Sequence, residues 1–393
     1  MPSRFPIEVL VLTDLLSVWS NAKHKTTLCF TNNSMNRILC LIDSLGSGGA
    51  QRQMTELAKL LHRAGYPAKV VFWIHYENDH FLEDELARSQ VDFAYTPSMR
   101  KTSTRLFELR KVIKGYSPDV IISYYSGISK LLCVDHLSHR KNYKLIVSER
   151  TITRQITRSS KVKHQLYRLA DVIVPNSTTE SNFIKEHFPF LKDKVITINN
   201  FVDEEKFYPP EKTVGDYENT NAIFVGRYNE AKNIPSFLRA LAKVAQTGRK
   251  FHVDFFGRDI AAHCDALVDE LGIKDFVTFC NQSSTIEEEY RKHNLMIIPS
   301  LWEGFPNVLC EAMCCGLPAL GSRVSDIPYI MEDGENGYIF NPKDVDDMAE
   351  KIIKYLDLDA RTKWKMGKHS ETLSSTRFLK NSFLNQYLQL IND

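Results

Sequence analysis

Zinc-type cysteine spacings, internal repeats and low-complexity tracts are all absent from the 393 residues of this chain. Its eight cysteines form no Cys-x-x-Cys pair, and Cys314 and Cys315 stand side by side in a helical pattern. This usage argues against a scaffold held by metal or disulfides and favours reduced thiols that serve as small apolar residues, as in the cytosol. With 43% hydrophobic and 25% charged residues, the composition is that of a globular protein, and the length suits two domains.

The N-terminal region also lacks an apolar run that could cross a bilayer. Residues 9–19 are apolar, but they include Asp14 and follow Glu8, so they are too short for a span and too acidic at the front for a signal peptide. A clean strand pattern begins only at residues 37–42. We therefore expect residues 1–34 to be an N-terminal extension of a cytoplasmic protein, with an upstream choice of start codon as the alternative.

The formal net charge is only +2, but basic residues are concentrated in one segment. Residues 100–168 hold sixteen Lys or Arg and four Asp or Glu, a local charge of +12. A basic patch of this size attracts polyanions such as anionic lipid head groups, a lipid diphosphate or nucleic acid. A solvated surface without a partner is the plainer alternative.

Short β-branched or apolar runs alternate with segments of helical period, and the alternation occurs in two series. This pattern is typical of parallel sheets with helices on both faces. The expected strands are 37–42, 68–74, 119–123, 144–148, 171–175 and 194–198, then 222–225, 251–256, 276–279, 295–299 and 338–340. The expected helices include 49–64, 105–115 and 178–187, then 234–246, 261–271, 285–292, 307–315 and 345–356.

The predicted fold class is α/β, with two doubly wound Rossmann-like domains that face a cleft. The first domain is placed at 35–200 and the second at 220–372, joined by a linker at 201–219 that has no long apolar period. A last helical segment, 373–393, has no strand after it, and packing back on the first domain is one arrangement for it. Ligands of such sheets bind beyond the carboxyl ends of the strands, so the cleft is the expected site.

A glycine-rich turn follows the first expected strand. Gly48 and Gly49 stand in the run 46–51, where the backbone can approach a ligand closely and the next helix presents its N-terminus to an anion. An ordinary strand-to-helix turn is the alternative. The run lacks the Gly-x-Gly-x-x-Gly spacing of dinucleotide binders, which argues against a nicotinamide oxidoreductase.

A second loop of interest, residues 225–233, follows the first strand of the second series. Arg227 offers a planar fork for phosphate oxygens, and Lys232 offers a mobile point charge, so the two could hold a diphosphate. A solvated loop before a helix that Asn233 caps is the alternative.

The most specific segment is Pro299-Ser-Leu-Trp-Glu-Gly-Phe-Pro-Asn-Val-Leu-Cys-Glu311, in which a strand ends, a loop turns and a helix begins. The free N–H groups at the start of that helix would suit a diphosphate. Glu303 and Glu311 are eight residues apart, which is about 12 Å along a helix, so they cannot share one proton. We therefore expect them to contact different parts of a long ligand. A buried helix with a capping carboxylate is the alternative.

These segments resemble the motifs of retaining GT-B glycosyltransferases of family 4. The Glu-x7-Glu segment carries the resemblance, and the Gly-Arg-x4-Lys-Asn run at 226–233, the Gly-Gly turn and the run 334–340 support it from about Met35 to the C-terminus. The run Ser148-Glu-Arg150 resembles one found in transferases of polysaccharide and lipid-linked oligosaccharide synthesis, where many relatives place a histidine instead.

The resemblance assigns a role to each candidate residue. It implies that Arg227 and Lys232 hold the donor diphosphate, that Glu303 contacts the sugar hydroxyls, and that Glu311 binds the ribose. It implies weaker roles for Glu149 and Arg150 as the sugar contact of the first domain. The remaining implied contacts with sugar, phosphate or base are Gly304, Phe305, Pro306, Asn307, Val308, Leu309, Gly257, Cys280 and Asn281.

A metal is not expected. Two Asp-x-Asp strings begin at Asp344 and Asp357, but a helix cap explains the first, and relatives use cations and helix ends in place of a metal. No other cofactor is expected beside the nucleotide sugar.

The predicted function is transfer of a hexose or N-acetylhexosamine, UDP-linked by preference, to a glycan or polyprenyl-diphosphate-linked acceptor in surface polysaccharide synthesis. The basic first domain favours peripheral contact with an anionic membrane surface over nucleic acid. A sugar-nucleotide epimerase, a sugar phosphate synthase and a non-catalytic glycan-binding module of the same fold remain alternatives.

Overall fold

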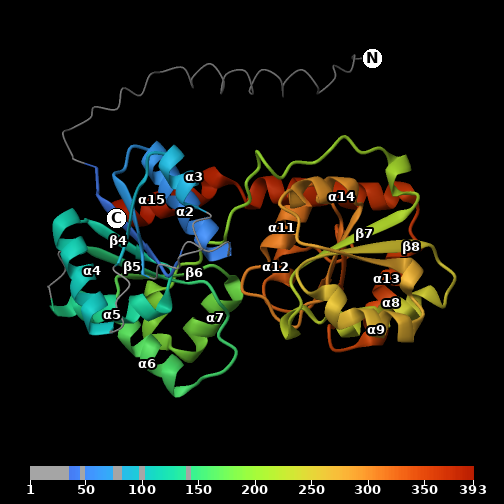
Figure 1. Cartoon of the computed structure of the whole chain (residues 1–393), viewed down its shortest axis with the longest axis horizontal. Coiled ribbons are helices and arrows are strands. Elements are labelled where there is room, and N and C mark those ends of the chain that lie inside the picture. The colour runs from blue at the N-terminus through green and yellow to red at the C-terminus, as the bar shows by residue number, and fades with distance from the viewer. Residues whose placement is uncertain (1–34, 45–48, 74–81, 97–101, 139–142) are drawn as a thin grey trace, which may run out of the picture. The chain divides into compact units, whose positions relative to one another are not determined.

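The computed structural model describes residues 35–44, 49–73, 82–96, 102–138 and 143–393. The expected extension at residues 1–34 and Gly48 of the glycine-rich turn lie outside these described residues. The described chain builds two parallel six-stranded sheets, with strands between residues 38 and 175 in the first and between 220 and 340 in the second (Figure 1). The prediction of two doubly wound α/β sheets is confirmed.

The first sheet has the strand order β3-β2-β1-β4-β5-β6, and every neighbouring pair is parallel. Its strands are β1 (Ile38–Ile42), β2 (Ala68–Phe72), β3 (Asp92–Tyr95), β4 (Val120–Ser123), β5 (Lys144–Glu149) and β6 (Val172–Pro175). Its helices are α2 (Gly49–Arg63), α3 (Glu83–Arg88), α4 (Thr102–Tyr116), α5 (Ser126–Ser138), α6 (Arg158–Tyr167) and α7 (Thr178–His187).

The second sheet has the order β12-β11-β10-β7-β8-β9, again with parallel pairs only. Its strands are β7 (Thr220–Val225), β8 (Phe251–Phe256), β9 (Val277–Cys280), β10 (Leu295–Ile298), β11 (Ala319–Ser322) and β12 (Gly337–Phe340). Its helices are α8 (Ile234–Ala245), α9 (Ile260–Leu271), α10 (Ile286–Lys292), α11 (Asn307–Cys314), α12 (Ile327–Ile330) and α13 (Val345–Leu356). If the strands of each sheet are numbered from the first strand of that sheet, the two sheets have the same strand order. The direction in which successive strands are added reverses between β1 and β4 in the first sheet and between β7 and β10 in the second.

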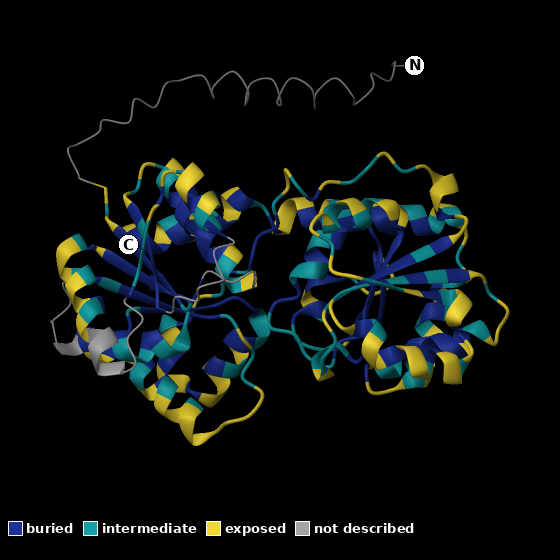
Figure 2. Ribbon diagram, in the orientation of Figure 1, coloured by how far each residue is buried: buried dark blue, intermediate teal, exposed yellow. Residues whose placement is uncertain are grey.

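Strands such as β1 and β10 are buried along their whole length, which explains why they are apolar throughout, whereas β8 alternates buried apolar residues with half-buried ones that include His252 and Asp254. In β1, Ile38, Cys40 and Ile42 join the core on one face, while Leu39 and Leu41 join the core on the other. Figure 2 shows the strands of both sheets as largely buried, with the exposed residues on the outer faces of the helices. In the second sheet, α8, α9 and α13 supply one core, and α11 and α12 supply the opposite one (Figure 1).

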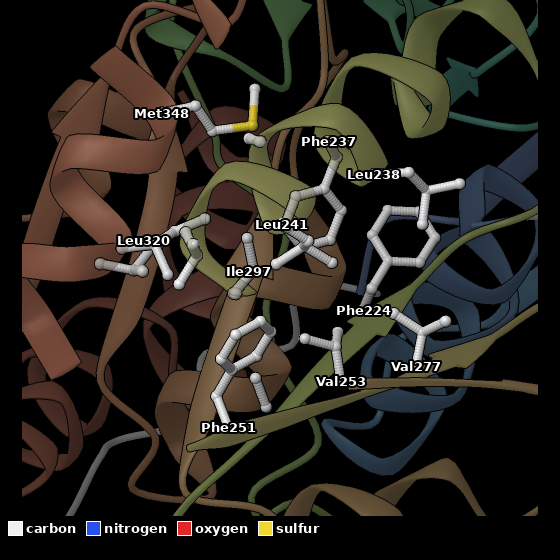
Figure 3. Packing of buried hydrophobic residues seen from close by; sticks show 14 of the residues in the cluster. Phe224, Phe237, Leu238, Leu241, Phe251, Val253, Val277, Ile297, Leu320 and Met348 are labelled. Carbon is white, nitrogen blue, oxygen red and sulfur yellow. The ribbon is translucent and has the colours of Figure 1, made fainter. Parts of the chain in front are cut away.

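The core beneath α8 is made of aromatic and branched side chains from several strands and helices (Figure 3). α8 carries an apolar stripe at the helical period, and the stripe faces β7 and β8. The labelled members of this cluster are Phe224, Phe237, Leu238, Leu241, Phe251, Val253, Val277, Ile297, Leu320 and Met348.

The C-terminal segment consists of two helices, α14 (Ala360–Arg377) and α15 (Lys380–Asn392), rather than a single one. Leu373 of α14 belongs to the core that α11 shares with the second sheet. Phe383 and Tyr387 of α15 belong to the same core as β1 and α2 of the first sheet. The chain therefore returns to the first sheet after completing the second.

Three strand predictions need correction. Residues 194–198 do not form a strand, and Val195 makes only an isolated bridge to Ile173. The first sheet instead contains β3, an edge strand that was not predicted because it is short and begins with a charged residue. The second sheet also contains the unforeseen β11, in which Gly321 and two small residues lack the β-branched signal.

None of the helices in the described residues is both long enough and apolar enough to cross a membrane.

Candidate active site

The loops that leave β7 and β10 carry both predicted donor motifs and flank the reversal of strand order in the second sheet. Residues 226–233 connect β7 with α8, and residues 299–306 connect β10 with α11. Sheets of this kind bind ligands at the reversal, beyond the carboxyl ends of the strands. The predicted phosphate loop and the predicted sugar loop therefore lie side by side at the position where a ligand is expected.

Two glycines let the loop after β7 lie directly against the loop after β8. The N–H of Gly226 donates to the Phe256 carbonyl at 2.9 Å, and the N–H of Gly257 donates to the Cys280 carbonyl at 3.3 Å. A Cβ atom on Gly257 would fall 1.9 Å from the Gly226 carbonyl oxygen, so only glycine fits. Asn281, the residue after β9, is exposed at the end of this row of loops.

The side chain of Lys232 is held over the start of its own loop. A Cβ atom on Gly226 would lie 3.0 Å from Cε of Lys232, so the lysine stem occupies the space that a side chain would need. Asn233, in the left-handed conformation with φ 54°, fixes the end of the loop. Its Nδ2 donates to the carbonyls of Pro299 and Pro342 at 3.2 and 2.8 Å, after β10 and β12.

Lys232 and Glu303 form an ion pair that joins the two loops. Nζ of Lys232 lies 2.7 Å from Oε1 of Glu303, and the side chains are only 16% and 13% exposed. The hydroxyl of Ser300 donates to the same Oε1 at 2.5 Å, while the N–H of Glu303 donates to Oγ of Ser325 at 2.9 Å. Neither side-chain contact uses Oε2 of Glu303. Arg227 is exposed on the loop that carries Lys232.

The N-terminus of α11 lies against Gly49 at the start of α2. Pro306, which precedes the helix, supplies no side-chain cap. Oδ1 of Asn307 accepts a hydrogen bond of 2.8 Å from Nδ2 of Asn200, which directly precedes the predicted linker. A Cβ atom on Gly49 would lie 2.9 Å from Nδ2 of Asn307, so the start of α2 and the start of α11 meet at van der Waals distance.

The segment from Gly304 to Leu309 is anchored by its side chains. Phe305 and Leu309 are buried in the core beneath α11, and Val308 is partly buried against it. Gly304 lies against the end of β5, since a Cβ atom there would be 3.2 Å from the Arg150 carbonyl. The apolar side chains thus point inward, and the polar groups available to a ligand are those of the backbone.

Glu311, in the second turn of α11, is partly buried, and the pKa of its carboxyl is shifted. Burial raises the pKa of its carboxyl to about 7, against the opposing effect of the cations Arg52 and Lys206. Lys206 also lies 3.3 Å from Glu287. The hydroxyl of the fully buried Tyr290 faces this carboxylate, but its geometry does not make a hydrogen bond. Burial first, and Glu311 second, raise the pKa of Tyr290 well above its usual value.

The carboxylate of Glu149, at the end of β5, is engaged within the first sheet's own helices. Its Oε2 accepts a hydrogen bond of 2.8 Å from Nζ of Lys163, and its Oε1 accepts one from the hydroxyl of Tyr167. Glu149 is 3% exposed. These contacts give the residue a structural role in holding α6, and its predicted role as a sugar contact stays a prediction.

Arg150 connects the end of β5 with Asn200 and with the C-terminal helix α15. Its Nη1 donates to Oδ1 of Asn200 at 2.8 Å, and its Nη2 donates to the hydroxyl of Tyr387 at 3.2 Å. The guanidinium also stacks on the ring of Tyr124, with Cζ 3.5 Å from the centroid. Since Asn200 also binds Asn307, Arg150 supports the start of α11 through one intermediate residue.

A pocket of about 540 Å³ opens between loops of the two sheets, and its lining includes Leu301 and Trp302, which precede Glu303 in the chain. The guanidinium of Arg154, after β5, lies over the ring of Trp302, with Cζ 3.6 Å from the centroid. Thr153 is fixed next to it, because its N–H and its hydroxyl both donate to the buried carboxylate of Glu180 at 2.6 Å. The lining residues are Ile152, Thr153, Arg154, Thr179, Phe183, Glu230, Leu301, Trp302 and Lys343.

Sequence reasoning missed several side chains that support the site. Ser300 stood within the quoted motif and could have been found, because a hydroxyl three residues before a carboxylate is a common partner. Ser325, Asn200 and Arg154 carry no local signal, since each acts on a residue far away in the sequence.

The Asp-x-Asp strings are explained by helix caps. Asp344 accepts hydrogen bonds from the N–H groups of Asp346 and Asp347 at the start of α13. Asp359 accepts one from Thr362 at the start of α14. Within the described residues, no three His, Cys, Asp or Glu side chains are grouped as metal ligands.

Two parallel sheets of this order, with cationic and carboxylate loops at the reversal in the second, define the GT-B class of fold. The family model described as Glycosyltransferase Family 4 matches residues 47–206, and the model described as Glycosyl transferases group 1 matches residues 219–357. The chain belongs to glycosyltransferase family 4.

The similar proteins are distant from this chain in sequence, whether or not their activity is known. The chain is 27% identical over 231 residues to the N-acetyl-alpha-D-glucosaminyl L-malate synthase of Bacillus anthracis, covering 57% of this chain and 60% of that one. It is 25% identical over 300 residues to an uncharacterized 41.2 kDa protein in the cps region of Klebsiella pneumoniae, covering 71% and 80%. HepE of Anabaena, solved in complex with UDP-glucose, has the same fold, with a TM-score of 0.76, 18% identity, and coverage of 91% and 99%.

Proposed function

We propose that this protein transfers a sugar from a nucleoside diphosphate sugar, UDP-linked by preference, to a glycan or polyprenyl-diphosphate-linked acceptor, with retention at the anomeric carbon. The ion pair of Lys232 with Glu303, beside the start of α11 and at the strand reversal, carries this proposal. The UDP-glucose complex of HepE, which shares the fold, supports a nucleotide sugar as the donor.

The chemistry requires the bond between the anomeric carbon and the diphosphate to break. Negative charge grows on the leaving diphosphate, and Arg227, Lys232 and the N-terminus of α11 would stabilise it. Positive charge grows on the sugar ring, and Glu303 would stabilise it or orient the ring through a hydroxyl. Glu311 would bind the ribose. Water must be kept away from the sugar, since hydrolysis competes with transfer.

The acceptor would enter through the pocket that Arg154 and Trp302 line. An aromatic ring and a guanidinium next to Glu303 suit a sugar that carries hydroxyl or acidic groups. The pocket supports this assignment because residues from both sheets line it and it adjoins the proposed sugar position. Trp302→Ala should weaken use of the acceptor more than binding of the nucleotide, whereas equal losses would argue for a general packing role.

Contact with an anionic membrane would bring the enzyme to a lipid-linked acceptor. α6 supports this view, because exposed Arg158 and Lys161 stand beside the apolar Ile156 and Val162, which are 42% and 58% exposed. Basic residues attract anionic head groups, and exposed apolar side chains can enter the interface. The Klebsiella relative, named for its cps region, is consistent with surface polysaccharide synthesis.

A panel of nucleotide sugars tests the proposal. Each sugar would be incubated with the protein, and release of the free nucleoside diphosphate would be measured, with Glu303→Gln as the control. Turnover of one donor is the expected result. Release of an epimerised free sugar would favour the epimerase alternative. Binding of nucleotides without turnover of any donor would favour the non-catalytic alternative and contradict the proposal.

A further inference from the structure

Asp326, between β11 and α12, bonds the backbone of a helix that belongs to the other sheet. Its Oδ2 accepts a hydrogen bond of 2.7 Å from the N–H of Thr178, and its Oδ1 accepts one of 2.8 Å from the N–H of Thr179. These are the first two residues of α7, and Asp326 is only 1% exposed. A buried carboxylate of the second sheet thus binds the N-terminus of a helix of the first sheet.

The helix does not need this carboxylate as its ordinary cap. Ser177 already occupies the N-cap position of α7, and its side chain accepts from the N–H of Glu180 at 3.2 Å. Asp326 satisfies two further N–H groups of the first turn and places a negative charge at the positive end of the helix dipole. The contact therefore joins the two sheets in addition to finishing a helix.

Ser325, the preceding residue, makes the connection to the proposed active site. Its hydroxyl accepts the hydrogen bond of 2.9 Å from the N–H of Glu303. Its backbone is in the left-handed region with φ 50°, which is uncommon for a residue other than glycine, asparagine or aspartate. Strained conformations of this kind are maintained where the surroundings hold them in place, and here the two neighbouring contacts do so.

We propose that Ser325 and Asp326 form a positioning turn that couples the docking of α7 to the placement of Glu303. The coupling runs from the N–H groups of Thr178 and Thr179 through Asp326 and Ser325 to the backbone of Glu303. Loss of the α7 contact would release the turn and, with it, the loop that presents the Glu303 carboxylate. The proposal rests on the proposed function only for the role of Glu303, since the coupling itself can be observed without turnover.

The first test follows backbone exchange and needs no substrate. Hydrogen exchange would be measured by mass spectrometry on wild type, Asp326→Asn, Ser325→Gly and Ser177→Ala. Asp326→Asn replaces one accepting oxygen by a donor group, so exchange should rise both at residues 178–179 and around residue 303. Ser177→Ala is the matched control, because it loosens α7 without touching Asp326, and exchange around residue 303 should stay as in wild type.

The second test separates positioning from stability. Turnover of the donor found in the nucleotide-sugar panel, affinity for UDP and thermal unfolding would be measured on the same proteins. We expect Asp326→Asn to lower kcat by about tenfold, which corresponds to one lost charged hydrogen bond, while the affinity for UDP changes less than about twofold. Ser325→Gly should behave similarly despite relief of its strained φ. Ser177→Ala should lose stability but keep its kcat.

Two outcomes would overturn the proposal. Unchanged exchange around residue 303 in Asp326→Asn would show that the contact with α7 does not reach Glu303. A loss of kcat in Ser177→Ala equal to that in Asp326→Asn would show a general effect of weakening α7. If wild type turns over no nucleotide sugar, the proposed function fails, but the exchange experiment still decides whether the coupling exists.

Discussion

At the scale of single residues, the proposed donor site has two groups with different assigned roles that are bonded to each other. Lys232 is assigned to the diphosphate and Glu303 to the sugar, yet their charged atoms lie 2.7 Å apart and are largely buried. Removing one member of a buried pair leaves the other charge uncompensated. The two roles are therefore coupled energetically, although they concern different parts of the ligand.

This coupling predicts the behaviour of three variants. Lys232→Ala should weaken binding of UDP and also turnover, because a diphosphate contact exists before and after reaction. Glu303→Gln should lower turnover strongly and change the affinity for UDP little, because its interaction is felt mainly in the transition state. The loss of transition-state stabilisation calculated from kcat/KM for the double variant should be smaller than the sum of the two single losses by about 1 kcal/mol. Steady-state rates and calorimetry measure both, and strictly additive losses would contradict the pairing.

Glu311 predicts a pH dependence of nucleotide binding. Burial raises the pKa of its carboxyl to about 7, so the group is mostly protonated at pH 6 and mostly ionised at pH 8. If the ribose hydroxyls donate to the ionised form, the affinity for UDP should rise by about tenfold over this range. The phosphate of UDP also titrates near pH 6, and Glu311→Gln is the control, since it keeps that contribution and loses the other. Equal pH profiles for both proteins would exclude a role for the Glu311 charge.

The same shift affects the stability of the fold with the opposite sign. A carboxyl whose pKa is raised on folding binds more protons in the native state than in the unfolded state between about pH 4.5 and 7. The contribution of Glu311 to stability is therefore greatest at low pH and is lost as the pH rises through 7. Nucleotide binding and folding stability thus respond in opposite directions to ionisation of one residue.

At the scale of elements, the loops after β7 and β8 depend on a contact that only glycine allows. In Gly257→Ala, the new Cβ would lie 1.9 Å from the Gly226 carbonyl, so the loop that carries Arg227 and Lys232 must move. We expect a lower melting temperature and weaker binding of UDP. Gly115→Ala, in α4, is the matched control, since no atom lies within 4 Å of its new Cβ. It should be neutral or stabilising, because alanine favours a helix by about 1 kcal/mol over glycine.

Much of the fold was predictable because its elements carry strong local patterns. β1 and β10 are continuous apolar runs, β8 alternates apolar with polar residues, and α8 and α13 have clear amphipathic periods, so their existence and type followed from the sequence. β3 and β11 were missed because their four residues each are defined by pairing with a neighbouring strand rather than by composition. Residues 194–198 have the composition of a strand, but they make a single bridge and no ladder.

The candidate site likewise has a part that the sequence predicts and a part that it does not. Lys232 and Glu303 stand in contiguous motifs, and the structure brings them together as neighbouring loops of one sheet. The contacts of Asn307 with Asn200, and of Asp326 with Thr178, join residues more than 100 positions apart. Nothing in the local sequence distinguishes such polar residues from ordinary surface residues. Only the fold shows that they lie where the two sheets meet.

At the scale of the whole molecule, the uneven charge distribution predicts where the proposed contact with an anionic membrane would form. The segment 100–168 carries a charge of +12, whereas the whole chain carries only +2. α6 is one part of it where basic and apolar side chains are exposed together, as Arg158, Lys161 and Val162 show, and α4 is another, with Phe107 beside Lys111. A localised surface of this kind should bind lipid through its own residues, whereas attraction by net charge alone would be independent of position.

A pair of matched charge reversals distinguishes these cases. Arg158→Glu with Lys161→Glu should abolish most binding to vesicles that contain phosphatidylserine, since each basic residue near an anionic surface contributes about 1 kcal/mol. Lys250→Glu with Lys274→Glu changes the net charge equally, but it alters exposed residues outside the basic segment. It should leave binding nearly as in wild type.

Val162→Asp should weaken binding even at high salt, because it removes an apolar contact rather than an attraction that salt screens. Co-sedimentation with anionic and neutral vesicles over a range of salt makes the comparison. Equal loss in the two double variants would mean that only net charge matters, and equal binding of wild type to neutral vesicles would exclude an electrostatic membrane surface altogether.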